Sequence, residues 1–224
     1  MSAQLDHLVV AAATLDEGVA WCEATLGITP GPGGQHALMG THNRLFSIAS
    51  ADFPLAYFEI IAIDPAASDP GRRRWFDLDD EALQARLRHE GPQLVHWVAR
   101  VNDAPAAVTA LHTQNIDRGE VIAASRSTAQ GLLQWQITVR PDGQRLFDGL
   151  LPTLIQWGDV HPAADMPPSG ITLAALELQH PQANVLNAAS ATLELVQPRV
   201  QPGPARLSAC LQTPYGALTI STKG

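Results

Sequence analysis

The feature that most constrains the fold of this chain is a repeated pattern of predicted elements. Residues 5–10, Leu-Asp-His-Leu-Val-Val, have the two-residue alternation of a β-strand, which places Leu5 and His7 on one face. Residues 94–99, Leu-Val-His-Trp-Val-Ala, repeat that pattern. We therefore treat His7 and His96 as equivalent positions in two copies of one unit. A unit of this size must pack against its copy to bury its apolar face.

Each of these strands is followed by a predicted helix and three further strands. Thr14 and Glu17 form a capping box at the start of the first helix, and Asp103 is a suitable N-cap for the second. The last strands place Glu59 and Gln156 at matching positions, so the repeat reads His…Glu and then His…Gln. The three strands are expected at 28–37, 43–49 and 55–63 in the first copy, and at 119–128, 132–140 and 152–158 in the second.

The repeat also divides the chain into segments. Residues 1–63 form a first βαβββ module, 64–93 a linker with a short helix, and 94–162 a second βαβββ module. Proline and glycine then interrupt the pattern, and residues 163–224 contain a βαβββ-like segment that we interpret as a degenerate third copy packed on the core. The expected fold class is α+β, with paired βαβββ modules and an additional C-terminal segment.

Composition excludes several classes of function. Charged residues make up 16% of the 224 residues and the net charge is −8, so a basic surface for nucleic acid is not expected. No apolar run approaches the length of a membrane span, and the chain starts with a strand pattern instead of a signal peptide. Cys22 and Cys210 form no CxxC pair, which argues against a cysteine metal site. We expect a cytoplasmic protein with a small-molecule partner, and homodimerisation stays open.

Several motifs resemble those of the vicinal oxygen chelate superfamily, most closely its glyoxalase-like domain proteins. The superfamily also includes glyoxalase I, extradiol dioxygenases and fosfomycin resistance proteins. The resemblance extends over residues 5 to 162, and the order and spacing of the motifs carry it. The motifs are Leu5-Asp6-His7-Leu8-Val9-Val10, Gly33-Gly34-Gln35-His36 with Gly40-Thr41-His42-Asn43, Tyr57-Phe58-Glu59-Ile60-Ile61-Ala62, Leu94-Val95-His96-Trp97, Gly149-Leu150-Leu151-Pro152 followed by Leu154-Ile155-Gln156-Trp157-Gly158, and His161-Pro162.

This resemblance implies an open barrel, in the manner of glyoxalase and bleomycin resistance proteins, in which each module forms one half. It also implies that His7, Glu59, His96 and Gln156 converge on a divalent ion such as Zn, Fe, Mn, Ni or Co, with Glu59 as the catalytic residue. A substrate with adjacent oxygens would chelate this ion. Gln156 departs from the glyoxalase I pattern, because an amide cannot accept a proton at neutral pH. A site without metal therefore stays open.

Three more residues are expected to bind substrate. His42 and Asn43 adjoin a glycine-rich turn that also contains His36, and Arg126 lies in a strand of the second module. An arginine can bind a carboxylate or a phosphate through its guanidinium group. The alternatives are local turn chemistry for His42 and Asn43 and a surface position for Arg126.

The leading functional hypothesis is a metal-dependent lyase, isomerase or dioxygenase that acts on a small oxygenated metabolite. The alternative is a metal-free protein of the same fold that binds and sequesters a small molecule, which the amide of Gln156 favours. In a third reading the repeat is only structural or dimerising, and His7 and His96 lie in separate cores. The sequence leaves open whether the chain is an enzyme.

Overall fold

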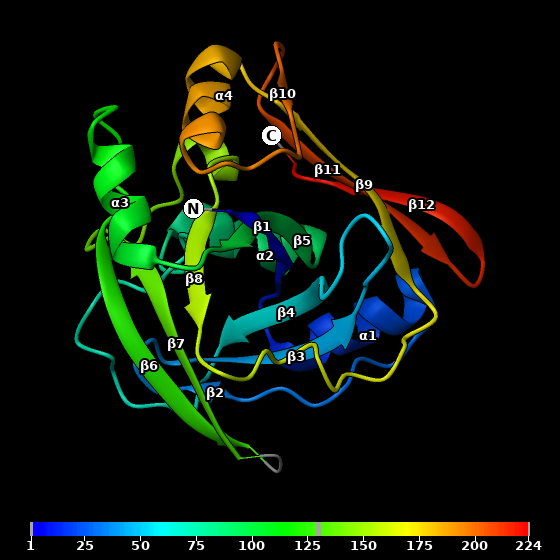
Figure 1. Ribbon diagram of the computed structural model, residues 1–224. Helices are drawn as coiled ribbons and strands as arrows, with labels where there is room; N and C mark the ends of the chain where they lie inside the picture. Colours follow the sequence, from blue (N-terminus) through cyan, green and yellow to red (C-terminus); the bar gives the residue numbers. More distant parts are fainter. Residues whose placement is uncertain (1, 129–130, 224) are drawn as a thin grey trace.

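The computed structural model describes residues 2–128 and 131–223. The chain forms a curved eight-stranded sheet and a smaller four-stranded sheet (Figure 1). In the large sheet the strands run in the order β2-β3-β4-β1-β5-β8-β7-β6. Its strands are β1 (Gln4–Ala11), β2 (Gln35–His36), β3 (Thr41–Ser47), β4 (Tyr57–Ile63), β5 (Gln93–Arg100), β6 (Glu120–Thr128), β7 (Gly131–Val139) and β8 (Thr153–Trp157).

The large sheet consists of two modules with matching connectivity. In each module the first strand pairs in parallel with the last, β1 with β4 and β5 with β8. The modules join where β1 pairs antiparallel with β5. The α+β fold with paired βαβββ modules is therefore confirmed.

Helix α1 (Leu15–Leu26) follows β1, and helix α3 (Ala104–His112) follows β5. The Thr14 side chain accepts a hydrogen bond from the backbone N–H of Glu17, and Asp103 accepts one from Ala106, as the cap motifs predicted. Helix α2 (Glu81–Glu90) lies between the modules, and a short 3-10 helix, η1 (Phe147–Gly149), precedes β8.

The two edges of the large sheet approach each other. A Cβ atom placed on Gly34, just before β2, would lie 2.1 Å from Nη1 of Arg126 on β6. The first and last strands of the sheet order are therefore brought together by curvature of the sheet (Figure 1). Side chains on the concave side are enclosed by this curvature.

The C-terminal segment has the expected element order but a different pairing. It contains β9 (Thr172–Gln179), α4 (Ala183–Thr192), β10 (Val200–Gln201), β11 (Arg206–Thr213) and β12 (Gly216–Ser221). The strand order is β10-β9-β11-β12, so its first strand pairs with the second and third, whereas in the modules it pairs with the last. The strand pairing therefore differs from that of the two modules, because the sequence order of elements does not determine which strands pair, and descent from a third copy stays a prediction.

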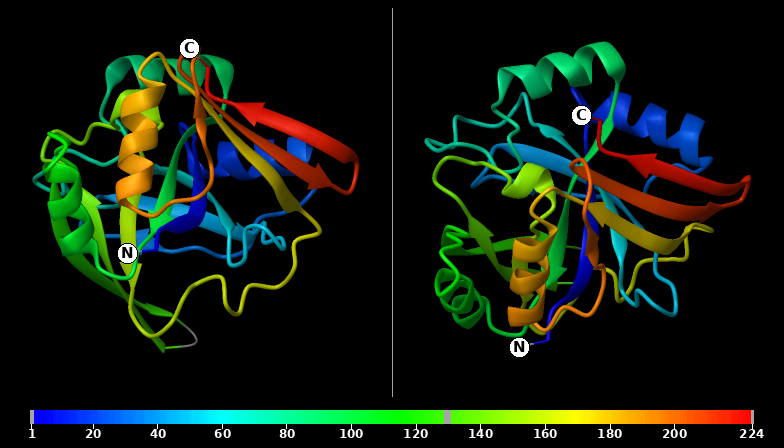
Figure 2. Two further views of the ribbon diagram at one scale, coloured as in Figure 1. Left: turned by 45° about the horizontal axis from the view of Figure 1, so that its top comes forward. Right: turned by 90° about the horizontal axis from the view of Figure 1, so that it is seen from above.

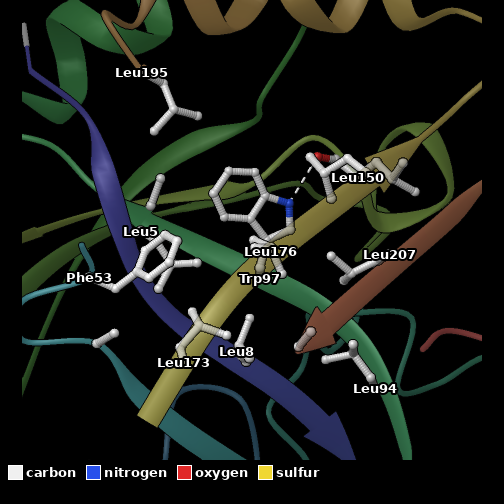
Figure 3. Packing of buried hydrophobic residues seen from close by; sticks show 14 of the residues in the cluster. Leu5, Leu8, Phe53, Leu94, Trp97, Leu150, Leu173, Leu176, Leu195 and Leu207 are labelled. Carbon is white, nitrogen blue, oxygen red and sulfur yellow. Dashed lines mark hydrogen bonds between the residues drawn. The ribbon is translucent and has the colours of Figure 1, made fainter. Parts of the chain in front are cut away.

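The C-terminal sheet packs against the convex side of the large sheet (Figure 2). Trp97 on β5 is 1% exposed, and its indole N–H donates to the carbonyl of Leu150 over 2.9 Å. Leu173 on β9 and Leu207 on β11 join the cluster around it (Figure 3). The opposite side of β1 and β5 is left to face the interior of the curved sheet. Within the described residues, no helix has the length and apolar character needed to cross a membrane.

Candidate active site

A β-bulge in β1 determines the arrangement of the site. Leu5 pairs with Ala99 and His7 with Val98, so Asp6 is an extra residue without a partner on β5. Leu5 consequently packs in the cluster around Trp97, and the expectation that it shares a face with His7 is wrong. Bulges often redirect a side chain beside an active site. Here the bulge allows Asp6 and His7 to interact on the interior side.

The carboxylate of Asp6 accepts hydrogen bonds from three side chains. His7 Nδ1 donates to Oδ1 over 2.6 Å, while Trp157 Nε1 and His161 Nε2 donate to Oδ2 over 3.0 and 2.9 Å. Burial alone would raise the pKa of Asp6, but the hydrogen bonds from His161 and His7 outweigh it and hold the pKa well below its usual value. Asp6 is therefore an anion, although its side chain is fully buried.

His7 presents its other ring nitrogen to Glu59. Because Nδ1 donates to Asp6, Nε2 is free to face the interior, and it lies 3.6 Å from Glu59 Oε2. The ring stacks on Tyr57 with 4.5 Å between ring centroids. Glu59 reaches this position because β4 pairs in parallel with β1, with Glu59 opposite Val9. His7 and Glu59 are thus 95% or more buried and adjacent.

Glu59 is oriented in turn by Asn43 on β3. Asn43 Oδ1 accepts from the backbone N–H of Gly34 over 2.8 Å, which leaves its amide group to donate to Glu59 Oε1 over 2.6 Å. The amide also lies 3.3 Å from His36 Nε2, and His36 Nδ1 lies 3.0 Å from Thr41 Oγ1. Burial, with a smaller effect from the Arg126 cation, lowers the pKa of His36 to about 3, so the ring is neutral and accepts from Asn43. His36, Asn43 and Glu59 thus form one hydrogen-bonded series, His7 and Asp6 form a second, and the two meet where His7 Nε2 lies 3.6 Å from Glu59 Oε2.

These side chains line a cavity of about 40 Å³. Its polar lining comes from His7, His36, Asn43, Glu59 and Arg126. The remaining lining is mainly aromatic and aliphatic: Leu45, Tyr57, Trp75, Phe76, Leu133, Trp135, Ile137, Ile155, Trp157 and Pro162. Four of the sequence-predicted site residues, His7, Asn43, Glu59 and Arg126, are therefore brought together.

His96 is buried outside this cavity. Its Nδ1 lies 2.8 Å from the carbonyl oxygen of Gly149, and the backbone N–H of Thr153 donates to its Nε2 over 3.1 Å. The Phe76 ring packs against it at 5.2 Å between centroids, and Phe76 itself lines the cavity. Burial holds the pKa of His96 well below its usual value, with Arg118 contributing. Both ring nitrogens are occupied by the protein, so no lone pair is free for a metal.

Gln156 also lies elsewhere. Its Oε1 accepts from the backbone N–H of Ala104 at the start of α3, over 2.8 Å, and its side chain lines a separate pocket. Strand register identifies the true counterpart of Glu59: Thr153 lies opposite Val98, two residues after His96, just as Glu59 lies opposite Val9. The sequence pattern predicted Gln156 at that position, but the pairing of β5 with β8 places Thr153 there instead.

The expected metal site does not fit this arrangement. Of the four proposed ligands only His7 and Glu59 meet in the cavity. In residues 2–128 and 131–223, no group of three or more His, Cys, Asp or Glu side chains is placed to hold an ion. We therefore derive no chemical step through a metal.

His42 differs from its neighbour Asn43. Strand alternation in β3 buries Thr41 and Asn43 on the interior side and leaves His42 half-buried, with Nδ1 4.0 Å from Asp64 Oδ1. His42 does not line the cavity, so its contact with substrate stays a prediction that this arrangement does not support.

The segment expected to be a linker contributes directly to the cavity. Trp75 and Phe76 line it, and the following turn has positive φ angles at Phe76 (60°) and Asp77 (59°). Arg145 Nε donates to Asp77 over 2.7 Å and holds this turn. The sequence did not lead us to predict that Trp75 and Phe76 line the cavity or that Asp6 holds His7. The available signal for Trp75 and Phe76 was a pair of adjacent aromatic residues within a polar segment.

Comparisons with known proteins agree with this fold. A family model described as a glyoxalase-like domain matches residues 5–194. A hypothetical protein from Staphylococcus aureus is 15% identical, with a TM-score of 0.60, and the alignment covers 100% of this chain and 87% of that one. A methylmalonyl-CoA epimerase in complex with methylmalonyl-CoA and NH4+ is 16% identical, with 72% and 99% coverage and a TM-score of 0.45.

The methylmalonyl-CoA epimerase from Mycobacterium tuberculosis is 17% identical, with 69% and 86% coverage and a TM-score of 0.40. No curated protein sequence matches the chain. The similarity to the Staphylococcus aureus protein extends over the whole chain and shows a shared fold. Since the family model covers most of the sequence, the chain belongs to the glyoxalase-like domain family, which confirms the resemblance drawn from its motifs.

Proposed function

We propose that this chain is an enzyme that moves a proton on a small oxygenated metabolite, as an isomerase or a lyase does. One observation carries the proposal: His7, held by Asp6 through Nδ1, presents Nε2 to the cavity beside the carboxylate of Glu59. Two proton-transferring groups next to each other suit a reaction in which one proton is removed and another returned.

The contacts assign a task to each group. His7 accepts a proton at Nε2, and the Asp6 carboxylate stabilises the imidazolium that results. Glu59 Oε2, 3.6 Å from Nε2, is placed to take or return the second proton. Asn43 holds the other oxygen of Glu59, which fixes the direction of Oε2. The surrounding aromatic side chains exclude water, which strengthens these interactions.

The experiment that tests this proposal is solvent deuterium exchange. The protein would be incubated in D2O with small hydroxyketones, aldehydes and 2-oxo acids, and exchange of carbon-bound hydrogen followed by NMR. We expect exchange with the wild type, and its loss by about 100-fold or more in His7→Ala and Glu59→Gln. His89→Ala is the matched control, because His89 is exposed on α2.

Unchanged exchange in His7→Ala and Glu59→Gln would contradict the proposal. Each assay would be repeated with Zn²⁺, Mn²⁺ and Ni²⁺ added and with a chelator, since the family resemblance implied a metal-dependent reaction. Exchange that appears only with added metal would support that reaction in place of the one proposed.

A metal-free binding protein is the second candidate, and the aromatic lining favours it. Trp75, Trp135 and Trp157 all face the cavity, and flat apolar walls suit the sequestration of a small molecule. A ligand that raises the melting temperature without any hydrogen exchange would favour this candidate. Homodimerisation stays a prediction, to be measured by sedimentation.

A further inference from the structure

Arg126 is held in the cavity without a counter-ion. It lies on β6, and its guanidinium group reaches across to Gly34 at the opposite edge of the sheet. Its Nε and Nη1 atoms are buried, and neither has a hydrogen-bond acceptor among the described residues. Among the salt bridges of the described residues, none joins Arg126 to a carboxylate within 4.0 Å. The Arg126 side chain as a whole is half-buried, but two buried donors without acceptors are costly, and proteins ordinarily pair such groups.

The acids nearest to this cavity are already engaged. Glu59 lines the cavity but accepts from Asn43, and Asp6 accepts from three other side chains. The protein therefore supplies partners for the two carboxylates but supplies none for the guanidinium. This unequal pairing suggests that the missing acceptor arrives with a ligand.

We propose that Arg126 binds the carboxylate of a small substrate and thereby turns the adjoining carbon toward His7 and Glu59. The proposal rests on the proposed function for the role of those two residues, but the binding step itself does not depend on catalysis. Arginine suits this task because its planar guanidinium matches carboxylate oxygens.

The size and charge of the cavity restrict the ligand further. One water molecule requires roughly 10–15 Å³ on the same measure, so about 40 Å³ accommodates a ligand of only a few heavy atoms. The Glu59 carboxylate in the same space disfavours a second negative charge on the ligand. A small monocarboxylate therefore fits better than a phosphate, which is largely a dianion near neutral pH.

The test compares matched neutral and anionic probes by calorimetric titration. Glycolate and glycolamide share a shape but differ in charge, and inorganic phosphate represents the dianion. We expect the wild type to bind glycolate at least about tenfold more tightly than glycolamide or phosphate, as loss of a charged hydrogen bond implies. Arg126→Met should lose this preference, and Arg126→Gln serves if the first variant fails to fold. Arg44→Met is the control, because Arg44 is exposed on the neighbouring strand β3.

Each result has a definite meaning. Equal binding of glycolate and glycolamide, undetectable binding of glycolate, or wild-type glycolate binding in both Arg126 variants would overturn the proposal. Glycolate binding that depends on Arg126 supports it even if no hydrogen exchange is found, which would count against the proposed function alone. In the free protein, Arg126→Met should not lower the melting temperature, because the substitution removes two buried donors that have no acceptor.

Discussion

At the scale of single residues, Asp6 controls the chemistry of the site from outside the cavity. It is not among the lining residues, yet its carboxylate binds His7, Trp157 and His161 together. His161 is fixed as a donor because its Nδ1 accepts from the backbone N–H of Ala163 over 3.1 Å. The orientation of His7 therefore depends on a group that never needs to contact a substrate.

The first prediction concerns this carboxylate. Asp6→Asn retains the shape of the side chain but removes its negative charge. The new amide N–H group then faces at least one of the three N–H groups that donate to Asp6. We expect the free energy of unfolding to fall by about 2–4 kcal/mol, because buried hydrogen bonds to a charged group are lost. Urea denaturation measures this change. A loss below about 0.5 kcal/mol would show that the hydrogen bonds to Asp6 do not hold these three side chains in place.

The second prediction is a pH dependence due to His36. Its pKa is about 3 in the folded protein, against an ordinary value of 6.5, so below pH 6.5 the unfolded chain binds the proton more readily. Stability is then retained above pH 6.5 and lost as the pH falls from there toward 3, at up to about 1.4 kcal/mol per pH unit. Urea denaturation at several pH values between 7 and 5 gives the free energy of unfolding at each pH. We expect this free energy to fall less steeply with decreasing pH in His36→Gln than in the exposed control His89→Gln. Equal slopes would contradict the assignment.

Residue type allowed part of the site to be predicted. His7, Asn43, Glu59 and Arg126 combine polar chemistry with positions on predicted strands, and all four line the cavity. The equivalence of His7 and His96 in the repeat did not extend to the cavity, which only His7 lines. His96 is occupied by backbone groups around Thr153, and such contacts come from loop geometry that single residues do not encode.

At the scale of elements, the turn before β2 brings two backbones into close contact. A Cβ atom on Gly33 would lie 1.9 Å from the carbonyl oxygen of Asn43. Only glycine permits this approach, and the neighbouring N–H of Gly34 then reaches the Asn43 side chain. The glycine-rich motif thus helps to position the Glu59 side chain, because it orients Asn43, which donates to Glu59.

The third prediction follows from that contact. Gly33→Ala should force the β2 edge away from β3, lower the free energy of unfolding by about 1–3 kcal/mol and weaken any ligand binding in the cavity. Gly203→Ala is the control, because a Cβ atom there meets its nearest neighbour, a side-chain oxygen, at 3.4 Å. Urea denaturation and calorimetric titration measure the two effects in both variants. Equal free energies of unfolding and equal ligand affinities in Gly33→Ala and Gly203→Ala would contradict the prediction.

Elements with local signals were predicted more accurately than those without. Thr14 and Asp103 cap their helices as expected, because a cap depends on residues three or four positions apart. Pairing between strands depends on distant residues, so Thr153 could not be recognised as the counterpart of Glu59. The same limit hid the different pairing of the C-terminal strands.

At the scale of the whole molecule, the C-terminal sheet supports the strands that carry the site. Its apolar side chains pack against the convex side of β1 and β5, while His7 faces the concave side. Leu207 and Trp97 belong to this shared core. The accessory segment therefore stabilises the positions of β1 and β5 without contributing a residue to the cavity lining.

The fourth prediction tests this support. Leu207→Asp places a charge in a fully buried apolar position, so we expect a loss of more than about 4 kcal/mol in a single cooperative unfolding transition. Val196→Asp is the control, because Val196 is 77% exposed and should be nearly neutral. Urea denaturation followed by tryptophan fluorescence measures this loss, and Trp97 is one of the five tryptophans that contribute to the signal. Two separate transitions in the wild type would show that the C-terminal sheet unfolds independently.

The extra residue in β1 has a counterpart in β5 at the equivalent point, because Asp6 directly precedes His7 and Val95 directly precedes His96. The duplicated strands therefore share the same irregularity of the backbone, and only the residue type at the extra position differs. An aspartate there gives His7 an acidic partner, whereas a valine leaves the ring of His96 to the backbone of Gly149 and Thr153. A single substitution at a conformationally special position is enough to divide the two copies into one reactive and one structural histidine.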